Sequence, residues 1–556
     1  MTGHVIELDL GPVVALYEFG FDDSRVTGKI SPSLQVLNHL QYLNLNFIDF
    51  QSNPFPNTLA SMSNLQQLHV SNASLTGPIP HQLVNLSNLL YLDLSRNSLG
   101  SIPFSLGDLT SLTYLNLSQN LLGGGVIPKS FGNCSSLVHL DLSQNHFSRS
   151  FPSFAGCSSL TNLSLAHNSL SGSIPDFIQC TSLKYLDLSS NLSSNHLFGN
   201  VPNSVGQVSN LRFLDFSSNS LEGVISEIHL LNLTQLLYLD LSFNSLALDS
   251  SVHGRIVFQL STIKLQSCKL GPRFPVWIKT QKHFTHLDIS NAGISDSVPD
   301  WFWDLPLELN FLNISSNEIE GILPDMTYIF DVYPGMDLSN NHFKGRVPSL
   351  PSLATLNLSG NRFSGTLSFL CNFDSALTFL DLSNNLLSGS LPDCWLNFQE
   401  KLVVLNLSNN NLSGKIPSSL GFLYNLEALY LRANTFVGEV PMSLRNCRRL
   451  RFVDLGENKL SGNIPKWIGE ELSELYVLVL GSNRFYGMLP SQVCWLYNLQ
   501  VLDLSNNGSS GNLPRCFDNF TAMSKIIFGG GKITNHSYSS FTGRTMCISL
   551  HFPCTD

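Results

Sequence analysis

A short pattern of leucine positions recurs along almost the whole chain. From Leu65 the sequence follows the frame L-x-x-L-x-L-x-x-N/A-x-L-x-G-x-I-P. The same frame returns at Leu89, Leu112, Leu137, Leu160 and Leu183, and continues from Leu211 through Leu499. The L-x-L part alternates apolar and polar residues, which predicts a short strand with its leucines turned inward. The G-x-I-P part places glycine at a tight bend and proline where no strand needs a backbone N–H.

An asparagine follows each predicted strand, and its amide turned inward can pair backbone groups that the bend leaves free. We assign this role to Asn97, Asn120, Asn145, Asn168, Asn191, Asn219, Asn244, Asn317, Asn341, Asn361, Asn385, Asn410, Asn434, Asn458, Asn483 and Asn507. Ile48, Ala73, Cys268 and Ala292 take the same position in other repeats. The mean spacing is about 24 residues, inside the range of roughly 20 to 29 for leucine-rich repeats.

One coil of this length cannot bury its leucine face alone, so neighbouring coils must bury it together. The prediction is an α/β repeat solenoid: a leucine-rich-repeat superhelix with a parallel β-sheet on the concave face and an irregular or 3-10 convex side. About 21 repeats would fill residues 1–515, with an irregular insertion at 14–36 and a bulged repeat near 191–200, where Leu-Ser-Ser-Asn occurs twice. Residues 516–556 lack the frame, so we interpret them as a non-repeat island or an aberrant tail.

The frame resembles the plant type of leucine-rich repeat, and the chain is similar to the ectodomains of plant leucine-rich-repeat receptor-like proteins. Within them it resembles the disease-resistance and fungal-xylanase-receptor group. The resemblance rests on TGHVIELDL at 2–10, GKISPSLQVLNHLQYLNL at 28–45, LSGSLPDCW at 387–395, VDLGENKLSGNIPKWIG at 453–469, QVCWLYNLQVLDLSNN at 492–507 and LPRCFDNFTAM at 513–523.

The resemblance implies a receptor at the extracellular side of the plasma membrane, in plant defence or developmental signalling. It would bind a protein or peptide and signal through partner receptor kinases of the leucine-rich-repeat class. Members of this group carry a signal peptide and a membrane helix, and neither is found in this sequence, so we expect a fragment truncated at both ends. The alternatives are a secreted inhibitor of a microbial wall-degrading enzyme, a receptor-kinase ectodomain, and a truncated decoy product.

Composition and motifs exclude several classes of partner and activity. Charged residues are 13% of the chain and the formal net charge is −10, which argues against a nucleic-acid partner. No apolar run approaches the roughly 18 to 20 residues that span a bilayer, so no membrane contact is expected in this fragment itself. Motifs for hydrolases, zinc proteases, P-loops and kinases are absent, so we expect no enzyme activity, no catalytic residue, no cofactor and no metal.

Cysteine spacing predicts two disulfides. Cys371 and Cys394 are 23 residues apart, and Cys494 and Cys516 are 22 apart. One coil separates the members of each pair, so their Cα atoms can approach to the roughly 4.4–6.8 Å that a disulfide needs. The alternative is buried thiols. Cys134, Cys157, Cys180 and Cys447 precede strands and are interpreted as free core thiols.

Ligand contacts are expected on the concave face, where residues between the strand leucines point. One column carries the aromatics Tyr91, Tyr114, Tyr185, Phe213 and Tyr238, which either anchor a ligand or pack sideways on one another. Residues on this face that differ from the usual Asp, Asn and Ser are stronger candidates for ligand contact. They are Lys264 and Gln266, and a second group formed by Tyr430, Arg432, Arg451, Phe452, Glu457, Tyr476 and Arg484.

Asparagines in the sequence N-x-S/T are candidate N-glycosylation sites. Those that do not occupy the inward asparagine position of a repeat are Asn85, Asn116, Asn133, Asn162, Asn232, Asn313, Asn357, Asn406, Asn411, Asn519 and Asn535. Asn-Leu-Ser also arises from the repeat itself, so part of this set carries no information about glycosylation.

Overall fold

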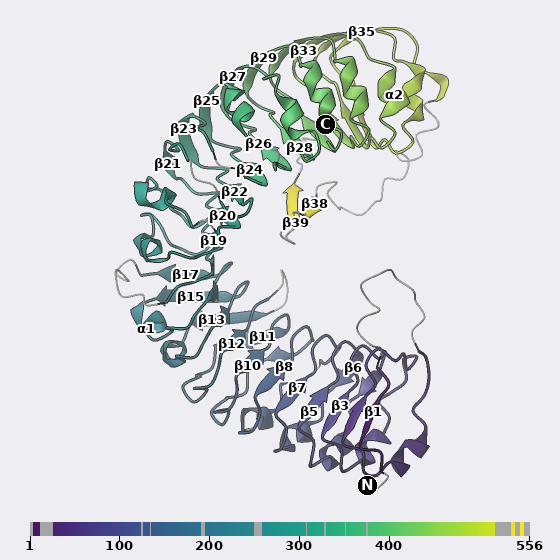
Figure 1. The fold of residues 1–556 in the computed structure, drawn as a ribbon, viewed down its shortest axis with the longest axis vertical. Coiled ribbons are helices and arrows are strands. Elements are labelled where there is room, and N and C mark those ends of the chain that lie inside the picture. Colours follow the sequence, from purple (N-terminus) through teal and green to yellow (C-terminus); the bar gives the residue numbers. More distant parts are fainter. Residues whose placement is uncertain are drawn as a thin grey trace. The chain divides into compact units, whose positions relative to one another are not determined.

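The computed structural model describes residues 4–11, 26–123, 126–133, 135–190, 195–249, 258–306, 308–326, 330–350, 352–373, 376–516, 535–539 and 545–549. The chain divides into two compact units. Unit 1 comprises residues 1–270 and 275–284, and unit 2 comprises 271–274 and 285–556. Both are stacks of coils built on a parallel sheet (Figure 1).

The main sheet of unit 1 contains one short strand from each coil, and consecutive strands pair in parallel register. In order they are β1 (Glu7–Asp9), β2 (Tyr42–Asn44), β3 (Gln67–His69), β5 (Tyr91–Asp93), β7 (Tyr114–Asn116), β8 (His139–Asp141), β10 (Asn162–Ser164), β12 (Tyr185–Asp187), β14 (Phe213–Asp215), β16 (Tyr238–Asp240) and β18 (Thr262–Lys264).

The main sheet of unit 2 is built in the same way. Its strands are β19 (His286–Asp288), β20 (Phe311–Asn313), β22 (Gly335–Asp337), β24 (Thr355–Asn357), β26 (Phe379–Asp381), β28 (Val404–Asn406), β30 (Ala428–Tyr430), β32 (Phe452–Asp454), β34 (Val477–Val479) and β36 (Val501–Asp503). The predicted fold class is therefore confirmed: a repeat solenoid with a long parallel sheet.

The strands are three residues long because only the L-x-L core of each repeat alternates. The middle leucine is buried, as at Leu163 and Leu186, while its two neighbours face outward. After the strand, the residue before the asparagine adopts a positive φ, for example 55° at His167. The Asn168 side-chain amide stabilises this turn and ties it to the preceding coil by donating to Leu142 O, Leu165 O and Ala166 O at 3.0–3.2 Å.

At the bulged repeat, the inward asparagine position is taken by a different residue from the expected Asn191. Asn191 lies outside the described residues, and Asn195 donates to Leu165 O and Leu188 O and accepts from Leu170 N instead. Asn195 precedes Asn219 by 24 residues, one ordinary coil. The duplicated Leu-Ser-Ser-Asn offered two candidate asparagines, and the one spaced correctly from the next coil takes the position.

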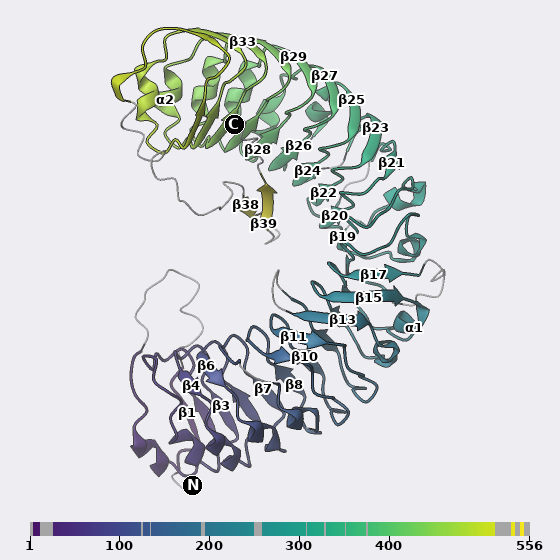
Figure 2. The same cartoon turned by 180° about the vertical axis from the view of Figure 1, so that it is seen from behind.

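Behind the main sheet, the expected irregular and 3-10 side also contains a second set of parallel strands (Figure 2). In unit 1 these are β4 (Thr76–Pro78), β6 (Ser98–Ser101), β9 (Ser148–Arg149), β11 (Ser169–Gly172), β13 (His196–Asn200), β15 (Ser220–Ile225) and β17 (Ser245–Leu248). In unit 2 they are β21 (Glu320–Gly321), β23 (His342–Arg346), β25 (Arg362–Gly365), β27 (Leu386–Ser390), β29 (Asn411–Gly414), β31 (Thr435–Gly438), β33 (Lys459–Asn463), β35 (Arg484–Gly487) and β37 (Gly508–Ser509).

Short helices close most coils, many of them beginning directly after the proline of the repeat. Over the described residues, the α-helices are α1 (Glu227–Leu230) and α2 (Trp467–Glu471). The 3-10 helices are Pro32–Val36, Leu59–Ser61, His81–Asn85, Phe104–Asp108, Lys129–Asn133, Asn203–Gln207, Val276–Thr280, Asp300–Trp303, Leu367–Asn372, Trp395–Phe398, Ser418–Phe422, Met442–Asn446 and Ser491–Trp495. A hairpin of β38 (Asn535–Ser539) and β39 (Thr545–Ser549) lies in the C-terminal segment. Among the helices described, none is long and apolar enough to cross a membrane.

Both expected disulfides form. Cys371 and Cys394 have Cα atoms 5.5 Å apart, and Cys494 and Cys516 have Cα atoms 5.9 Å apart. Cys157, Cys180 and Cys447 are buried free thiols, as expected, and Cys134 lies outside the described residues. Each disulfide ties one coil to the next.

Replacing both Cys371 and Cys394 by Ser should lower the free energy of unfolding of unit 2 by about 3 kcal/mol, because the bridge closes a loop of 23 residues. Urea unfolding followed by tryptophan fluorescence measures the loss, since the buried Trp395 lies directly after Cys394. Cys447→Ala, which removes a buried thiol without a bridge, is the control and should cost less. Equal losses in the two proteins would contradict a stabilising bridge.

Candidate functional site: the exposed face of the main sheets

The outward residues of the main sheets form columns because the strands pair in register. The first residue of each strand lies beside the first residue of its neighbours, and the third beside the third. Tyr185 pairs with Phe213, for example, and Asp187 with Asp215. Each unit therefore presents one column of first residues and one column of third residues.

In unit 1 much of the first column is a stack of rings. Ring centroids are 4.0 Å apart between Tyr91 and Tyr114, and 4.3 Å between Tyr114 and His139. In β3 the first residue is Gln67, and the ring that stacks on Tyr91, at 4.3 Å, is the third residue, His69. A second stack joins Tyr185, Phe213 and Tyr238 at 4.2 Å per step. The aromatics thus do pack sideways on one another, and each remains half-buried. Sideways packing and exposure coexist, because a stacked ring still shows its edge to solvent.

Acidic residues dominate the third column. One oxygen of each carboxylate accepts a backbone N–H two residues ahead, as Asp215 Oδ1 does from Ser217 N at 2.9 Å. Lys264, in β18, neutralises part of this column: its Nζ lies 3.0 Å from Asp240 Oδ2 and donates to Tyr238 Oη at 2.6 Å. Gln266 follows two residues later and its backbone N–H donates to Ser242 Oγ. Lys264 therefore belongs to an ion pair on this face.

Burial raises the pKa of Asp215 to about 7, and the charge of Asp240 adds to the effect. The folded protein consequently holds a proton on Asp215 between pH 4 and 7 that the unfolded chain has released. Stability therefore falls as pH rises through this window.

Replacing Asp215 by Ser should remove this pH dependence. Serine is tolerated at this register, since Ser164 occupies it in β10. The unfolding free energy of the Asp215→Ser protein, measured relative to that of the unmodified protein, should rise by on the order of 2 kcal/mol between pH 4 and pH 8. Thermal unfolding of both proteins at pH 4, 6 and 8 measures the difference. A difference that stays constant across pH would contradict the raised pKa.

In unit 2 the second candidate group is only partly accessible. Tyr430 and Phe452, expected as exposed anchors, are 7% and 1% exposed. Their neighbours on the outward positions are apolar, and they form a buried cluster composed of Phe379, Val404, Ala428, Tyr430, Phe452, Val477 and Val479. Tyr476 packs against this cluster and stays half-buried, with its ring 6.3 Å from Phe452. Apolar neighbours rather than water therefore surround the two rings.

Arg432, Arg451 and Glu457 of this group form ion pairs. Arg432 lies against Asp454 and Glu457, and Arg451 lies 3.1 Å from Glu427 and 3.3 Å from Glu474. Burial raises the pKa of Asp454 to about 6 despite Arg432. Arg484 is separate from them, because it begins β35 in the second set of strands. The structure thus brings together Tyr430, Arg432, Arg451, Phe452, Glu457 and Tyr476 but not Arg484.

Among the candidate glycosylation sites, Asn85, Asn232 and Asn411 are exposed, whereas five are half-buried outward residues of main-sheet strands. These five are Asn116, Asn162, Asn313, Asn357 and Asn406. The side chains of Asn133 and Asn535, and the whole of Asn519, lie outside the described residues. Glycosylation of all eleven stays a prediction.

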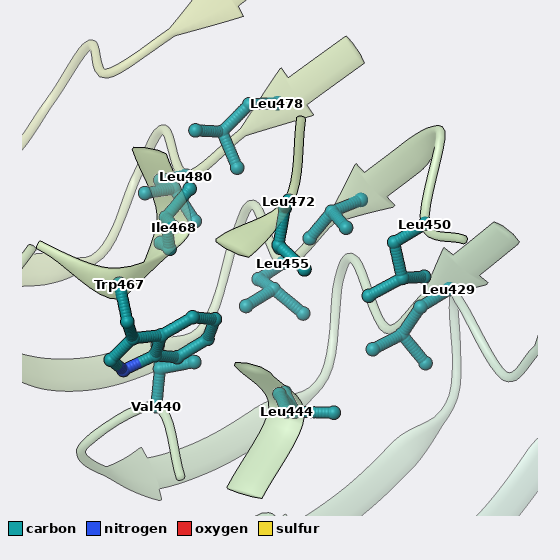
Figure 3. A pocket seen from close by; sticks show the side chains of 11 residues that line it. Leu429, Val440, Leu444, Leu450, Leu455, Trp467, Ile468, Leu472, Leu478 and Leu480 are labelled. Carbon is teal, nitrogen blue, oxygen red and sulfur yellow. The ribbon is translucent and has the colours of Figure 1, made fainter. Parts of the chain in front are cut away.

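A cavity inside unit 2 offers no ligand site. It measures about 10 Å³, room for about one water molecule, and only apolar side chains such as Leu455, Ile468 and Leu478 line it, beside Trp467 (Figure 3). Over the described ranges, no three His, Cys, Asp or Glu side chains gather to hold a metal ion. The candidate site is therefore the open face of the sheets.

Two features of this face escaped the sequence analysis. One is a hollow of about 350 Å³ across β8, β10 and β12, where Asn162 interrupts the ring stack. The other is the apolar run in unit 2 that includes Val404, Ala428, Val477 and Val479. Aligning the first and third residues of all strands would have shown both, because each is a departure of residue type within these two columns.

Comparison with known proteins supports a receptor ectodomain fold. The leucine rich repeat family models match residues 63–122 and, in a second form, 111–134, 136–157, 159–180, 352–373, 376–398, 401–423, 449–470 and 498–520. The tomato (Solanum lycopersicum) receptor-like protein EIX1 is 48% identical over 132 residues, which are 24% of this chain and 13% of that protein. The aligned region thus spans about an eighth of this relative's length.

Two solved plant structures are similar across most of the chain. The peptide hormone receptor RGFR1 in complex with RGF2 has a TM-score of 0.73 and 31% identity, covering 90% of this chain and 79% of that one. The Arabidopsis receptor kinase HAESA, in complex with the peptide hormone IDA and the co-receptor SERK1, has a TM-score of 0.63 and 28% identity, covering 94% and 85%. The chain is a leucine-rich-repeat protein, similar in sequence to plant receptor-like proteins and in fold to plant receptor ectodomains.

Proposed function

We propose that this chain is a non-catalytic recognition ectodomain that binds a protein or peptide on the outward face of its main sheets. The observation that carries the proposal is the character of this face. Half-buried aromatic rings and carboxylates are held in register on the strands, as at Tyr185 and Asp187, and arginines flank the strands, as Arg432 does two residues after β30. Aromatic and arginine side chains in such settings are the usual anchors of protein recognition.

The parent protein would lie at the extracellular side of the plasma membrane and signal through partner receptor kinases. The complex of HAESA with a peptide and SERK1 supports this arrangement by similarity of fold. Similarity to EIX1 supports a receptor-like protein, and the resemblance of the repeats to the disease-resistance group favours a role in plant defence, with developmental signalling as the other role.

The test expresses the full-length transcript in leaf cells that lack it and challenges them with microbial and plant protein fractions. We expect one fraction to induce both association with a receptor kinase of the leucine-rich-repeat class and an oxidative burst. Protease treatment of the fraction should abolish both responses. A response that survives protease, or a chain that instead inhibits a microbial wall-degrading enzyme without recruiting a kinase, would overturn the proposal.

A matched pair of variants links the response to the face. Arg451→Ala alters an ion-paired arginine beside the main sheet of unit 2, whereas Arg484→Ala alters an exposed arginine of the second strand set. The proposal expects a weaker response only from the first. Equal responses from both would remove this part of the face from the proposed binding surface.

A further inference from the structure

The ring stack of unit 1 is interrupted at one strand. His139 ends the first stack and Tyr185 begins the second, and the residue between them in register is Asn162 of β10. Neighbouring strands are about 4.8 Å apart, so the two rings stand roughly 10 Å apart across this strand. One planar group between them, at a spacing close to that of the existing ring pairs, would make the stack continuous.

The gap opens into the hollow of about 350 Å³. Its walls include His139 and Tyr185, and Asn162 and Ser164 lie on the strand between them. Because Ser164 and Ala166 are small where neighbouring strands carry Asp and Ser, the hollow extends along β10 past the ring column. A side chain inserted here would meet a ring on either side.

The hollow is acidic. Asp141 and Asp187 flank Ser164 in register, and no Lys or Arg is among the residues that line the hollow. One oxygen of each carboxylate accepts a backbone N–H, from Ser143 and Ser189. The second oxygen of Asp187 accepts from Tyr185 Oη at 3.2 Å. Burial lowers the pKa of His139, so that its ring is uncharged at neutral pH and does not offset the carboxylates.

We infer that the hollow binds an arginine side chain of the protein ligand, with the guanidinium stacked between His139 and Tyr185 and paired with Asp141 and Asp187. The inference rests on the proposed function, because the arginine belongs to the recognised protein. Guanidinium is planar, cationic and rich in N–H donors, so it satisfies the rings and the carboxylates together. A lysine ammonium cannot stack in this way, and a neutral aromatic ring leaves the carboxylates without a counter-charge.

A glycan on Asn162 would fill the same space. The inference therefore expects Asn162 to be unmodified, although Asn162-Leu163-Ser164 is a glycosylation sequence. Mass spectrometry of the peptide that carries Asn162, from the secreted protein, measures its occupancy. Full occupancy by a glycan would overturn the inference.

The direct test titrates the purified chain with Nα-acetyl-arginine methylamide and follows binding by saturation-transfer NMR. The citrulline analogue keeps the planar outline without the charge, and the lysine analogue keeps the charge without the plane. We expect the arginine compound to bind at least tenfold more tightly than either. Equal binding of the arginine and citrulline compounds, or of the arginine and lysine compounds, would contradict the inference.

Variants locate the binding. Asp141→Ser with Asp187→Ser removes both charges in favour of the residue that β10 already carries, and Asp503→Ser makes the same kind of change in β36, at a residue that does not line the hollow. Asn162→Tyr fills the gap with the residue of the next strand. Binding should fall at least tenfold in the double variant and in Asn162→Tyr, and persist in Asp503→Ser. Unchanged binding in Asn162→Tyr, with its fold verified by circular dichroism, would overturn the inference.

The two proposals fail separately. A chain that does not bind the arginine compound but still responds to a protein fraction would refute the arginine site alone. A chain that binds the compound, yet elicits no protease-sensitive response, would refute the recognition function and leave the site.

Discussion

An Asn168→Ala protein is expected to lose about 3–5 kcal/mol of unfolding free energy. The Asn168 side chain is fully buried, donates to three carbonyls and accepts from Phe147 N at 3.1 Å. Alanine would remove all four hydrogen bonds and leave the Phe147 N–H without the partner it has in the folded protein. Each of the three carbonyls would keep one donor, from Asn145 Nδ2, Asn195 Nδ2 and Gln144 N. Chemical denaturation measures the loss, and hydrogen exchange at Phe147 N reports whether it begins at this coil.

The control is Asn116→Ala in β7, two coils away. Asn116 is half-buried and its Oδ1 accepts from the N–H and hydroxyl of Ser118, close to solvent that can replace it. Its replacement should cost less than about 1 kcal/mol. Similar losses in the two variants would contradict the structural role assigned to the asparagine ladder.

A Gly206→Ala protein is expected to lose about 2–4 kcal/mol of unfolding free energy, because two neighbouring coils of unit 1 are in close contact at this glycine. A Cβ on Gly206 would lie 2.0 Å from Ile228 O and 2.9 Å from His229 Cα, so the 3-10 helix at 203–207 and α1 would have to separate. His229, whose Nε2 lies 3.0 Å from Val201 O, would be displaced with α1. Thermal unfolding measures the loss.

Gly100→Ala is the matched control, because nothing lies within 4 Å of a Cβ built on Gly100 and its φ is not positive. It should leave the melting temperature unchanged or raise it slightly, since alanine restricts the unfolded chain. If Gly206→Ala also melts at the temperature of the unmodified protein, the close approach of the coils is not a source of stability.

Much of the fold could be predicted because the sequence of each repeat determines the structure of its own coil. The L-x-L core fixes the strand and its inward face, and the spacing of cysteines across one coil predicted both disulfides. The second set of strands was missed because segments such as Ser169–Gly172 are too short and too glycine-rich to show alternation. The contact at Gly206 was missed because it depends on the distance between coils, which the pattern within one coil does not contain.

The site was predictable only in part. The column positions followed from the repeat, and the stacking of Tyr91 and Tyr114 was one of two outcomes foreseen. The burial of Tyr430 and Phe452 was not foreseen, since it depends on apolar residues of neighbouring strands such as Val404 and Val477. The hollow was also missed, because its defining residue, Asn162, is small and polar and resembles an ordinary repeat position.

The measurement that tests the account most directly is photo-cross-linking to the active protein fraction. A p-benzoylphenylalanine is placed at Tyr185, on the outward face of the main sheet, or at Phe104, which is 75% exposed in the 3-10 helix Phe104–Asp108. Both positions are aromatic and lie in unit 1, so they differ chiefly in the side they face. We expect an adduct with a protein of the fraction at Tyr185 and none at Phe104. An adduct at Phe104 alone, or equal adducts at both positions, would contradict recognition by the sheet face.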